Sequence, residues 1–325
     1  MDATLASEDS NSRIQTLVCR ASDGKISRIR VLVEFKPYQL RRRSTAPPPI
    51  VVERVEKLAK LLAHAKAPDA GFRALLCIAV VPQAPQTRFA FAFELPESSF
   101  PLGNAPLDLQ QAIKAKDGVR PTLGERFAMA TTIAQTIFEL HSVHWLHKSI
   151  RSDNVIFGQQ SVPTDRFRAI YRKPFIIGFE FSREQGDRST TEQDDRLERN
   201  IYRDPDRQGA PADSPRFTVL HDIYSLGVVL LEIGLWRLAY EFEDFSNSDA
   251  DSIRRSLQDH ARDRLPHYMG EDYTNAVLSC LNGTLVAPEV AKKLTLPDHK
   301  QQLLEVNMAL SEKIIDQIAR GVKGT

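Results

Sequence analysis

The sequence predicts an α+β protein in which a small β-rich half precedes a larger helical half. Residues 13–96 hold short apolar runs separated by turn residues, and one pair of runs surrounds an Asp-Gly dipeptide. After Pro96, apolar residues recur at helical spacing over long stretches. The 325 residues, 42% of them hydrophobic, can bury a core large enough for two packed units. We therefore expect a disordered segment over 1–12, a first unit over 13–96 and a second over 97–322.

The first unit should run strand, strand, helix, strand, strand. The Asp-Gly turn between the first two apolar runs predicts a β-hairpin. The following helix is expected because its apolar residues return every three or four positions. The expected strands lie at 14–19, 29–35, 75–81 and 88–95, and the helix at 51–65. In the last strand three phenylalanines alternate, which indicates one packed face.

The second unit should consist mainly of helices with two short strands between them. The expected helices lie at 107–116, 123–141 and 217–236, the strands at 155–157 and 174–177, and further helices follow to about residue 322. Residues 182–200 are polar and charged without an apolar period, so we expect a mobile loop there. The most apolar stretch, 224–236, contains Glu232 and is too short to cross a bilayer, so no membrane span is expected.

Charge and cysteine usage exclude several classes of protein. The net charge of +1 gives no global basic field, and we expect no nucleic-acid partner. The basic run 41–43 stands beside prolines and reads as a solvated linker. The three cysteines, Cys19, Cys77 and Cys280, are widely spaced and predict neither a zinc site nor a disulfide framework. A reducing, cytoplasmic compartment fits this usage.

Four segments of the second unit, taken together, resemble the motifs of a protein kinase. Residues 147–149 (His-Lys-Ser) and Asn154 have the spacing of the kinase His-Arg-Asp and its Asn, after a long helix ending in Leu-His. Residues 178–180 (Gly-Phe-Glu) stand where a kinase has Asp-Phe-Gly. Residues 202–206 resemble the Ala-Pro-Glu segment, and 221–227 resemble the start of the helix that anchors the large lobe.

The resemblance to the protein kinase-like superfamily covers roughly residues 13–320. It implies a bilobal protein-kinase-like fold with a small β-rich N-lobe and a larger helical C-lobe. The sequence around His-Lys-Ser and Arg-Ser-Asp-Asn is similar to that of fungal degenerate kinase-like domains. Such domains often follow a prion-inhibition-and-propagation (HeLo-type) helical domain, which the few residues before 13 are not expected to form.

Two positions that carry chemistry in a kinase have lost their carboxylates here. Ser149 replaces the Asp that accepts the proton of the substrate hydroxyl, and a positioned base contributes roughly 10² to 10⁴ in rate. Gly178 replaces the Asp that holds magnesium, an ion that prefers hard oxygen ligands. By contrast, His147, Phe179 and Asp222 match scaffold positions of the family. The resemblance therefore implies a retained fold with no intact catalytic residue.

The nucleotide site is also altered. Residues 33–36 (Val-Glu-Phe-Lys) resemble the Val-Ala-Ile-Lys of the third kinase strand, which makes Lys36 the phosphate-binding lysine. Glu34 lies on the same face as Lys36 and replaces the Ala that touches adenine. A carboxylate there brings bulk and a desolvation cost into an apolar slot. With Gly24 as its single glycine, the loop 20–25 is not expected to cover phosphates. Glu53 and Glu56 are the candidates to pair with Lys36, although a surface-facing role is favoured for both.

Several motif residues also have plainer interpretations. Asn154 could hold a metal or simply brace its loop, and Arg151 could meet a phosphate or face solvent. His141, His144 and His147 resemble a metal cluster, but two stand at a helix end and the third is explained by the motif, so no metal site is expected. Ser189, Thr190 and Thr191 could be phosphorylated as a charge switch, although a solvated loop is favoured.

Taken together, the sequence favours an inactive kinase-like module, a pseudokinase that binds protein partners without a cofactor. One alternative is an active atypical serine/threonine kinase, which would bind ATP and magnesium. It would need Asp153 as its base and Glu180 as its metal ligand. A second alternative is a small-molecule phosphotransferase of kinase-like fold.

Overall fold

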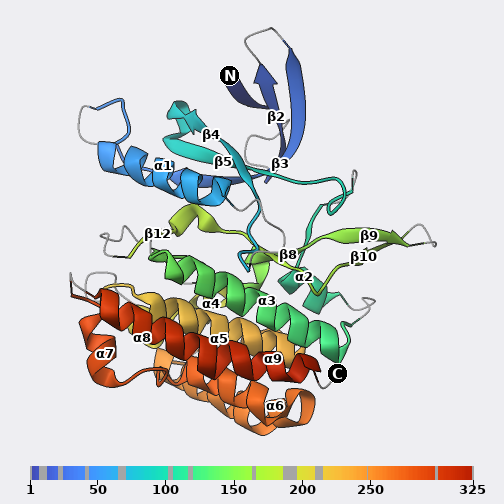
Figure 1. Ribbon diagram of the computed structural model, residues 1–325, viewed down its shortest axis with the longest axis vertical. Coiled ribbons are helices and arrows are strands. Elements are labelled where there is room, and N and C mark those ends of the chain that lie inside the picture. Colours follow the sequence, from blue (N-terminus) through green and yellow to red (C-terminus); the bar gives the residue numbers. More distant parts are fainter. Residues whose placement is uncertain are drawn as a thin grey trace.

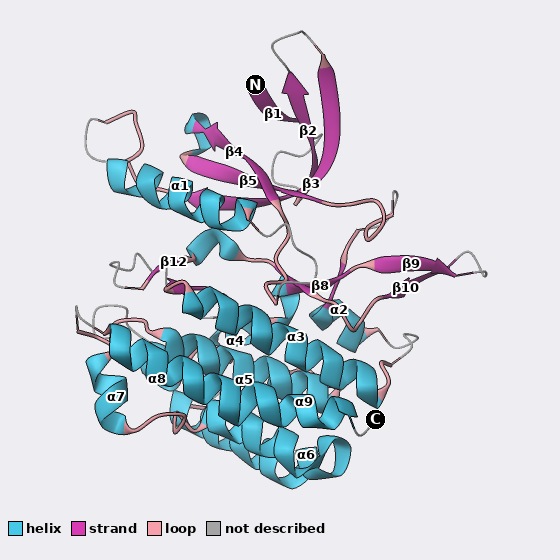
Figure 2. Cartoon of the chain, in the orientation of Figure 1, coloured by secondary structure: helices cyan, strands magenta, loops and turns pink. Residues whose placement is uncertain are grey.

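The computed structural model describes most of the chain: residues 2–6, 13–20, 25–40, 44–64, 71–101, 105–115, 120–162, 166–185, 196–208, 215–246, 248–296 and 299–323. The protein is α+β, as expected (Figures 1 and 2). A curled antiparallel sheet with helix α1 lies at one end, and most of the other helices pack together at the opposite end.

The sheet contains five strands in the order β1-β2-β3-β5-β4, and all neighbours are antiparallel. The strands are β1 (Asp2–Ala6), β2 (Ile14–Arg20), β3 (Ile26–Pro37), β4 (Cys77–Gln83) and β5 (Arg88–Glu94). The expected hairpin is formed by β2 and β3, and its turn, 21–24, lies outside the described residues.

The expectation of disorder over 1–12 is corrected by β1, which covers residues 2–6 and pairs with β2. The reason is an alternation too short to recognise in the sequence: Ala3 and Leu5 both pack against a core cluster of the sheet. Residues 7–12 lie outside the described part of the chain.

Helix α1 (Pro49–Ala63) packs on one face of the sheet. The phenylalanines of β5 do form a packed face, as predicted, and they share a core with the apolar side of α1. These residues are Phe89, Phe91 and Phe93 of β5 with Val55, Leu58 and Leu62 of α1. Smaller side chains form a second cluster on the sheet, namely Leu17, Cys19, Val31, Val33, Ala90 and Ala92.

Short strands connect the sheet to the helices. Strands β6 (Leu107–Asp108), β8 (Val155–Phe157) and β11 (Phe175–Ile176) form one small sheet, and β7 (Trp145–Leu146) pairs with β12 (Arg183–Glu184). The hairpin of β9 (Gln159–Val162) and β10 (Arg166–Ala169) projects from the side of the molecule (Figure 1). Strands β8 and β11 were predicted. Where a helix was expected at 107–116, the structure has the short strand β6 followed by helix α2.

The helical end is built around α5, which is buried along almost its whole length. The helices are α2 (Leu109–Lys114), α3 (Leu123–Ser142), α4 (Leu197–Asn200), α5 (Val219–Leu235), α6 (Ala250–Leu281), α7 (Pro288–Lys293), α8 (Lys300–Leu310) and α9 (Asp316–Lys323). Helix α6 is interrupted at Gly270, where φ is +78°. No helix in the described part of the chain combines the length and apolar character needed to cross a bilayer.

Two further expectations can be compared with the structure. Cys19, Cys77 and Cys280, for which no disulfide framework was predicted, are buried free thiols. The segment 182–200, expected as a loop, contains β12 at its start and α4 at its end, while 186–195 lie outside the described residues. Both elements are too short to show a period in sequence.

Candidate functional site

The segment 147–154 is held in place by Asp222, a fully buried residue in the first turn of α5. Its carboxylate accepts hydrogen bonds from the backbone amides of His147 (2.7 Å) and Lys148 (2.8 Å). The ring Nε2 of His141, at the end of α3, lies 3.2 Å from the same carboxylate. Although burial raises the pKa of Asp222, the bond and charge of His141 lower it below its usual value. The loop can therefore keep the left-handed backbone of Lys148, with φ of +68°.

The same loop is packed against the segment 178–182 through an aromatic contact. The rings of His147 and Phe179 are buried, with centroids 4.7 Å apart. Burial lowers the pKa of His147 to about 4, so the ring is neutral near pH 7. The hydroxyl of Ser182 donates to the carbonyl of His147 at 3.0 Å. These contacts join residues more than 30 positions apart and bring the two motif segments into one site.

The two positions without carboxylates meet at Asn154. Its amide Nδ2 donates to the carbonyl oxygen (2.8 Å) and the hydroxyl (3.1 Å) of Ser149. A Cβ atom added to Gly178 would lie 2.2 Å from the same Nδ2, and Gly178 has φ of +92°. Asn154 thus braces the loop, which agrees with the plainer of its two interpretations. Its amide group also takes up the space next to Gly178.

Glu34 reaches this site from β3, where it meets two backbone donors that the sequence did not predict. Its buried carboxylate accepts hydrogen bonds from the amides of Gly178 (2.5 Å) and Phe179 (2.7 Å). The desolvation cost expected of this carboxylate is therefore partly offset by two donors. Burial, and then the charge of Glu180, raise the pKa of Glu34 to about 7, while the two amides and Arg13 act in the opposite direction.

Lys36, two residues further along β3, also contacts the segment 178–182. Its ammonium donates to the backbone carbonyls of Glu180 (2.6 Å) and Ser182 (3.5 Å). The two glutamates considered as its partners, Glu53 and Glu56, are exposed on α1, as the surface-facing interpretation predicts. Glu53 forms an ion pair of 3.2 Å with Lys57.

Asp153 and Glu180, the residues considered as the base and the metal ligand of an active kinase, have different surroundings. Asp153 forms an ion pair with Arg151, whose Nε lies 2.9 Å from Oδ1. Glu180 has one buried carboxylate oxygen, Oε2, that accepts no hydrogen bond from the described residues. Of the three histidines, His141 and His147 are buried and His144 is exposed. Within the described ranges, no group of three or more His, Cys, Asp or Glu side chains could hold a metal ion.

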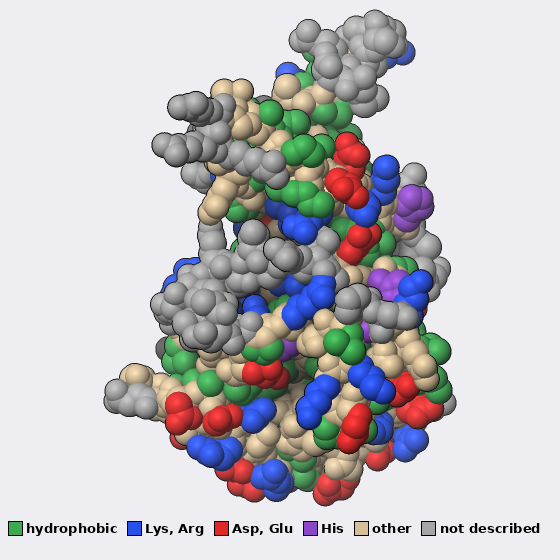
Figure 3. Space-filling model, turned by 90° about the vertical axis from the view of Figure 1, so that its left-hand side faces the viewer, with side chains coloured by type: hydrophobic (Ala, Val, Ile, Leu, Met, Phe, Trp, Pro, Cys, Tyr) green, Lys and Arg blue, Asp and Glu red, His purple; other side chains and the backbone are tan. Residues whose placement is uncertain are grey.

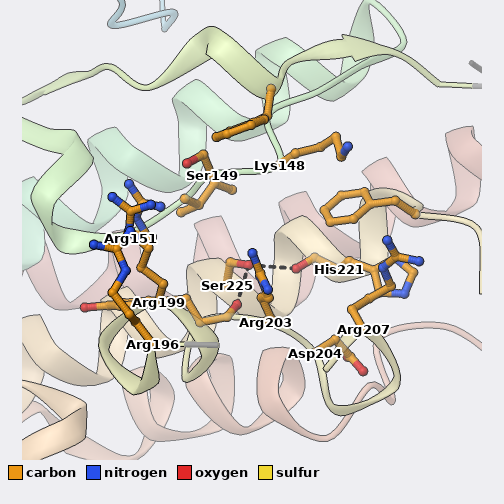
Figure 4. Close-up of a pocket in the computed structure, with 14 residues that line it drawn as sticks. Lys148, Ser149, Arg151, Arg196, Arg199, Arg203, Asp204, Arg207, His221 and Ser225 are labelled. Carbon is orange, nitrogen blue, oxygen red and sulfur yellow. Dashed lines mark hydrogen bonds between the residues drawn. The ribbon is translucent and has the colours of Figure 1, made fainter. Parts of the chain in front are cut away.

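A cavity that sequence reasoning missed opens next to Ser149. Its volume is about 370 Å³, and six basic side chains line it, as Figure 4 shows. They are Lys148, Arg151, Arg196, Arg199, Arg203 and Arg207. A signal was present in the sequence, because the last four arginines recur every three or four positions. Their convergence with Lys148 and Arg151, some 50 positions earlier, required the fold.

Comparison of the sequence with models of known protein families finds no match. A search of curated proteins also finds no significant relative.

Proposed function

We propose that this chain is a catalytically impaired protein kinase-like domain of bilobal form that serves as a protein-binding or signalling scaffold. The observation that carries the proposal is the pair of hydrogen bonds from Gly178 and Phe179 to the Glu34 carboxylate. A phosphotransferase needs carboxylate oxygens free to hold magnesium at this point. Here the nearest carboxylate from β3 is engaged by the protein's own backbone.

The absence of a base supports the same function. Ser149 offers a hydroxyl, which does not accept a proton near neutral pH without a base of its own, and a positioned base is worth roughly 10² to 10⁴ in rate. That hydroxyl accepts a hydrogen bond from Asn154. Of the two positions that hold magnesium in a kinase, Asn154 is the one that has a side-chain oxygen here, and its Nδ2 faces Ser149 and Gly178.

The internal contacts of the site suit a scaffold. Lys36 is bonded to two carbonyls of the segment 178–182, and Asp222 holds the neighbouring loop. A protein whose former reaction centre is closed by its own side chains presents a fixed surface, and fixed surfaces bind partners at a lower entropy cost.

The active atypical kinase is the second candidate, because Glu180 has a buried oxygen that could meet a metal. Purified protein should be incubated with γ-labelled ATP, magnesium and a general protein substrate. We expect no more label than with Lys36→Ala, and no thermal shift on adding ATP and magnesium. Lys57→Ala, which removes an exposed lysine of α1, is the matched control.

Label that is lost in Lys36→Ala and in Asp153→Asn, but kept in Lys57→Ala, would establish the atypical kinase and overturn the proposal. Label that all variants incorporate equally would indicate a contaminating kinase in the preparation. A repeat with freshly purified protein then decides between the two functions.

A further inference from the structure

The cavity beside Ser149, here named the arginine pocket, is built from four separate segments of the chain, one of them represented by Phe181. Lys148 and Arg151 come from the loop after β7, and Arg196, Arg199, Arg203 and Arg207 come from the segment around α4 and the short 3-10 helix Pro205–Arg207. Phe217, just before α5, completes one wall. Figure 4 shows Arg151, Arg196 and Arg199 on one side, Lys148 and Arg207 on the other, and Arg203 between them.

The charge of the pocket departs from that of the rest of the molecule. The whole chain is nearly neutral, with 43 basic and 42 acidic side chains. On the face shown in Figure 3, basic and acidic side chains are interspersed over the helical end. Among the described residues, six basic side chains and one carboxylate, Asp204, line the pocket, and one of the six, Arg151, is ion-paired with Asp153. Burial and the nearby Asp206 raise the pKa of Asp204.

Gathering so many cations costs folding free energy, and the titration of Lys148 reflects this cost. Burial, and then the charges of Arg183, Arg207 and Lys36, lower the pKa of Lys148 to about 7. Burial also lowers the pKa of Arg207. Like charges held in a half-buried pocket are stabilised by an anion that enters it, because an opposite charge favours the protonated form of each group.

Arginine is the residue whose planar fork matches phosphate oxygens in pairs, and clusters of arginines recognise phosphorylated side chains. The pocket also has apolar walls from Ile150, Phe181 and Phe217. The Phe217 ring lies 5.5 Å from the Lys148 ammonium and 5.8 Å from the Arg207 guanidinium. Apolar surface next to the cations can contact the residues that flank a phosphate in a peptide, which a free phosphate ion would leave unused.

We propose that the arginine pocket binds a phosphorylated serine or threonine within a segment of a partner protein. The phosphorylated segment is the class of partner that the proposed scaffold would bind, and only this link to a scaffold rests on the proposed function. Peptide binding is measured without ATP, so a failure here and a failure of the scaffold proposal are distinguishable.

The test uses fluorescence anisotropy of the whole chain with two labelled peptide libraries. Both have about nine residues, a length suited to an extended recognition segment, with a fixed central phosphoserine in one and serine in the other. We expect the phosphorylated library to bind at least about tenfold more tightly, and this binding to weaken between about 50 and 300 mM salt. Unlabelled inorganic phosphate and ATP should compete only at much higher concentrations than an unlabelled phosphopeptide.

The variant Arg199→Gln/Arg203→Gln should lose about tenfold or more in affinity, and Arg199→Lys/Arg203→Lys should recover part of it, because lysine keeps the charge but not the fork. Arg255→Gln/Arg262→Gln is the matched control, since it removes two exposed arginines of α6. Each pocket arginine is also replaced alone, so that misfolding of the double variant, detected by urea unfolding, leaves a usable comparison.

Equal affinity for the serine and phosphoserine libraries would overturn the proposal. So would equal losses in the pocket and control variants. Competition by inorganic phosphate or ATP as strong as that by phosphopeptide would show a small-anion site instead, and would overturn the assignment to a peptide.

Discussion

At Gly178 both the backbone conformation and the neighbouring side chain oppose any residue larger than glycine. The φ of +92° is one that L side chains rarely adopt, and a Cβ atom would meet Asn154 at 2.2 Å. In the proposed kinase-like frame this is the position where magnesium needs a carboxylate. The surroundings of Gly178 leave no room for a side chain at this position.

We predict that Gly178→Asp destabilises the protein by about 3 kcal/mol or more, because left-handed strain of roughly 1–2 kcal/mol adds to overpacking of roughly 1–3 kcal/mol. Urea unfolding measures the loss. Gly283→Asp is the control, since Gly283 also has positive φ (+65°) but open space around its Cβ position. It should lose only about 1 kcal/mol from strain. Equal losses in both variants would show that the contact with Asn154 is not a steric barrier.

The surroundings of some site residues could be predicted from the sequence, and those of others could not. The resemblance to kinase motifs implied that Ser149, Asn154 and Gly178 share a site, and their contacts agree. The partner of Glu34 could not be predicted, because Gly178 is 144 positions away and nothing in the intervening chain marks the pairing. The face of Lys36 was predicted correctly, but its contacts with backbone carbonyls leave no sequence pattern.

Among the elements, long periodic ones were predictable and short ones were not. Helix α3 has a capping box of Thr122 and Glu125 and a sustained apolar face, and its expected range, 123–141, ends one residue from the observed end. Two-residue strands such as β6 and β12 pair through tertiary contacts and carry no period. The hairpin of β9 and β10 was missed for a related reason, because both strands are short and polar.

Helix α5 is tied to its surroundings by Glu232, a carboxylate buried in an otherwise apolar helix. It accepts hydrogen bonds from the Tyr202 hydroxyl (2.9 and 3.0 Å), the Ala239 amide (2.8 Å) and the Ser152 hydroxyl. Burial raises the pKa of Glu232 to about 7 despite these donors. One side chain therefore connects α5 to the loop before it, to the turn after it and to the segment 152–154.

We predict that Glu232→Ala destabilises the protein by about 3 kcal/mol, because three buried donors lose their acceptor, each at roughly 1–3 kcal/mol before relaxation. Glu232→Gln should cost less, since its side-chain oxygen still accepts some of these bonds. Chemical denaturation compares both with Glu241→Ala, which removes an exposed glutamate nearby. Equal stability of Glu232→Ala and Glu241→Ala would contradict a tying role for the buried carboxylate.

In the whole molecule, strand β3 joins the sheet to the rest of the chain through polar contacts. Glu34 and Lys36 make the polar contacts of β3 with the segment 178–182. Arg30, also on β3, donates to the carbonyls of Phe100 (2.9 Å) and Pro101 (3.0 Å). Among these contacts, the bonds of Glu34 depend on the protonation of a buried carboxyl. The stability of the assembled molecule should therefore depend on pH through this residue.

The sign of that dependence follows from the pKa of Glu34, which rises from its usual 4.5 to about 7 in the folded protein, by burial and then by Glu180. Between these values the folded protein keeps a proton that the unfolded chain has released. Glu34 therefore stabilises the fold fully below pH 4.5, and this contribution is lost as the pH rises through 7.

We predict that the stability of wild type relative to Glu34→Gln falls by on the order of 2 kcal/mol from pH 5 to pH 8, because glutamine cannot titrate. Urea unfolding at half-unit steps of pH measures the difference, which cancels the titration of every other group, His147 included. Glu53→Gln is the control, because it makes the same change of charge at an exposed residue of α1. A wild-type advantage over Glu34→Gln that stays constant from pH 5 to pH 8 would contradict the prediction, because it would mean that the carboxylate is ionised in the folded protein throughout this range, with the amides of Gly178 and Phe179 outweighing burial.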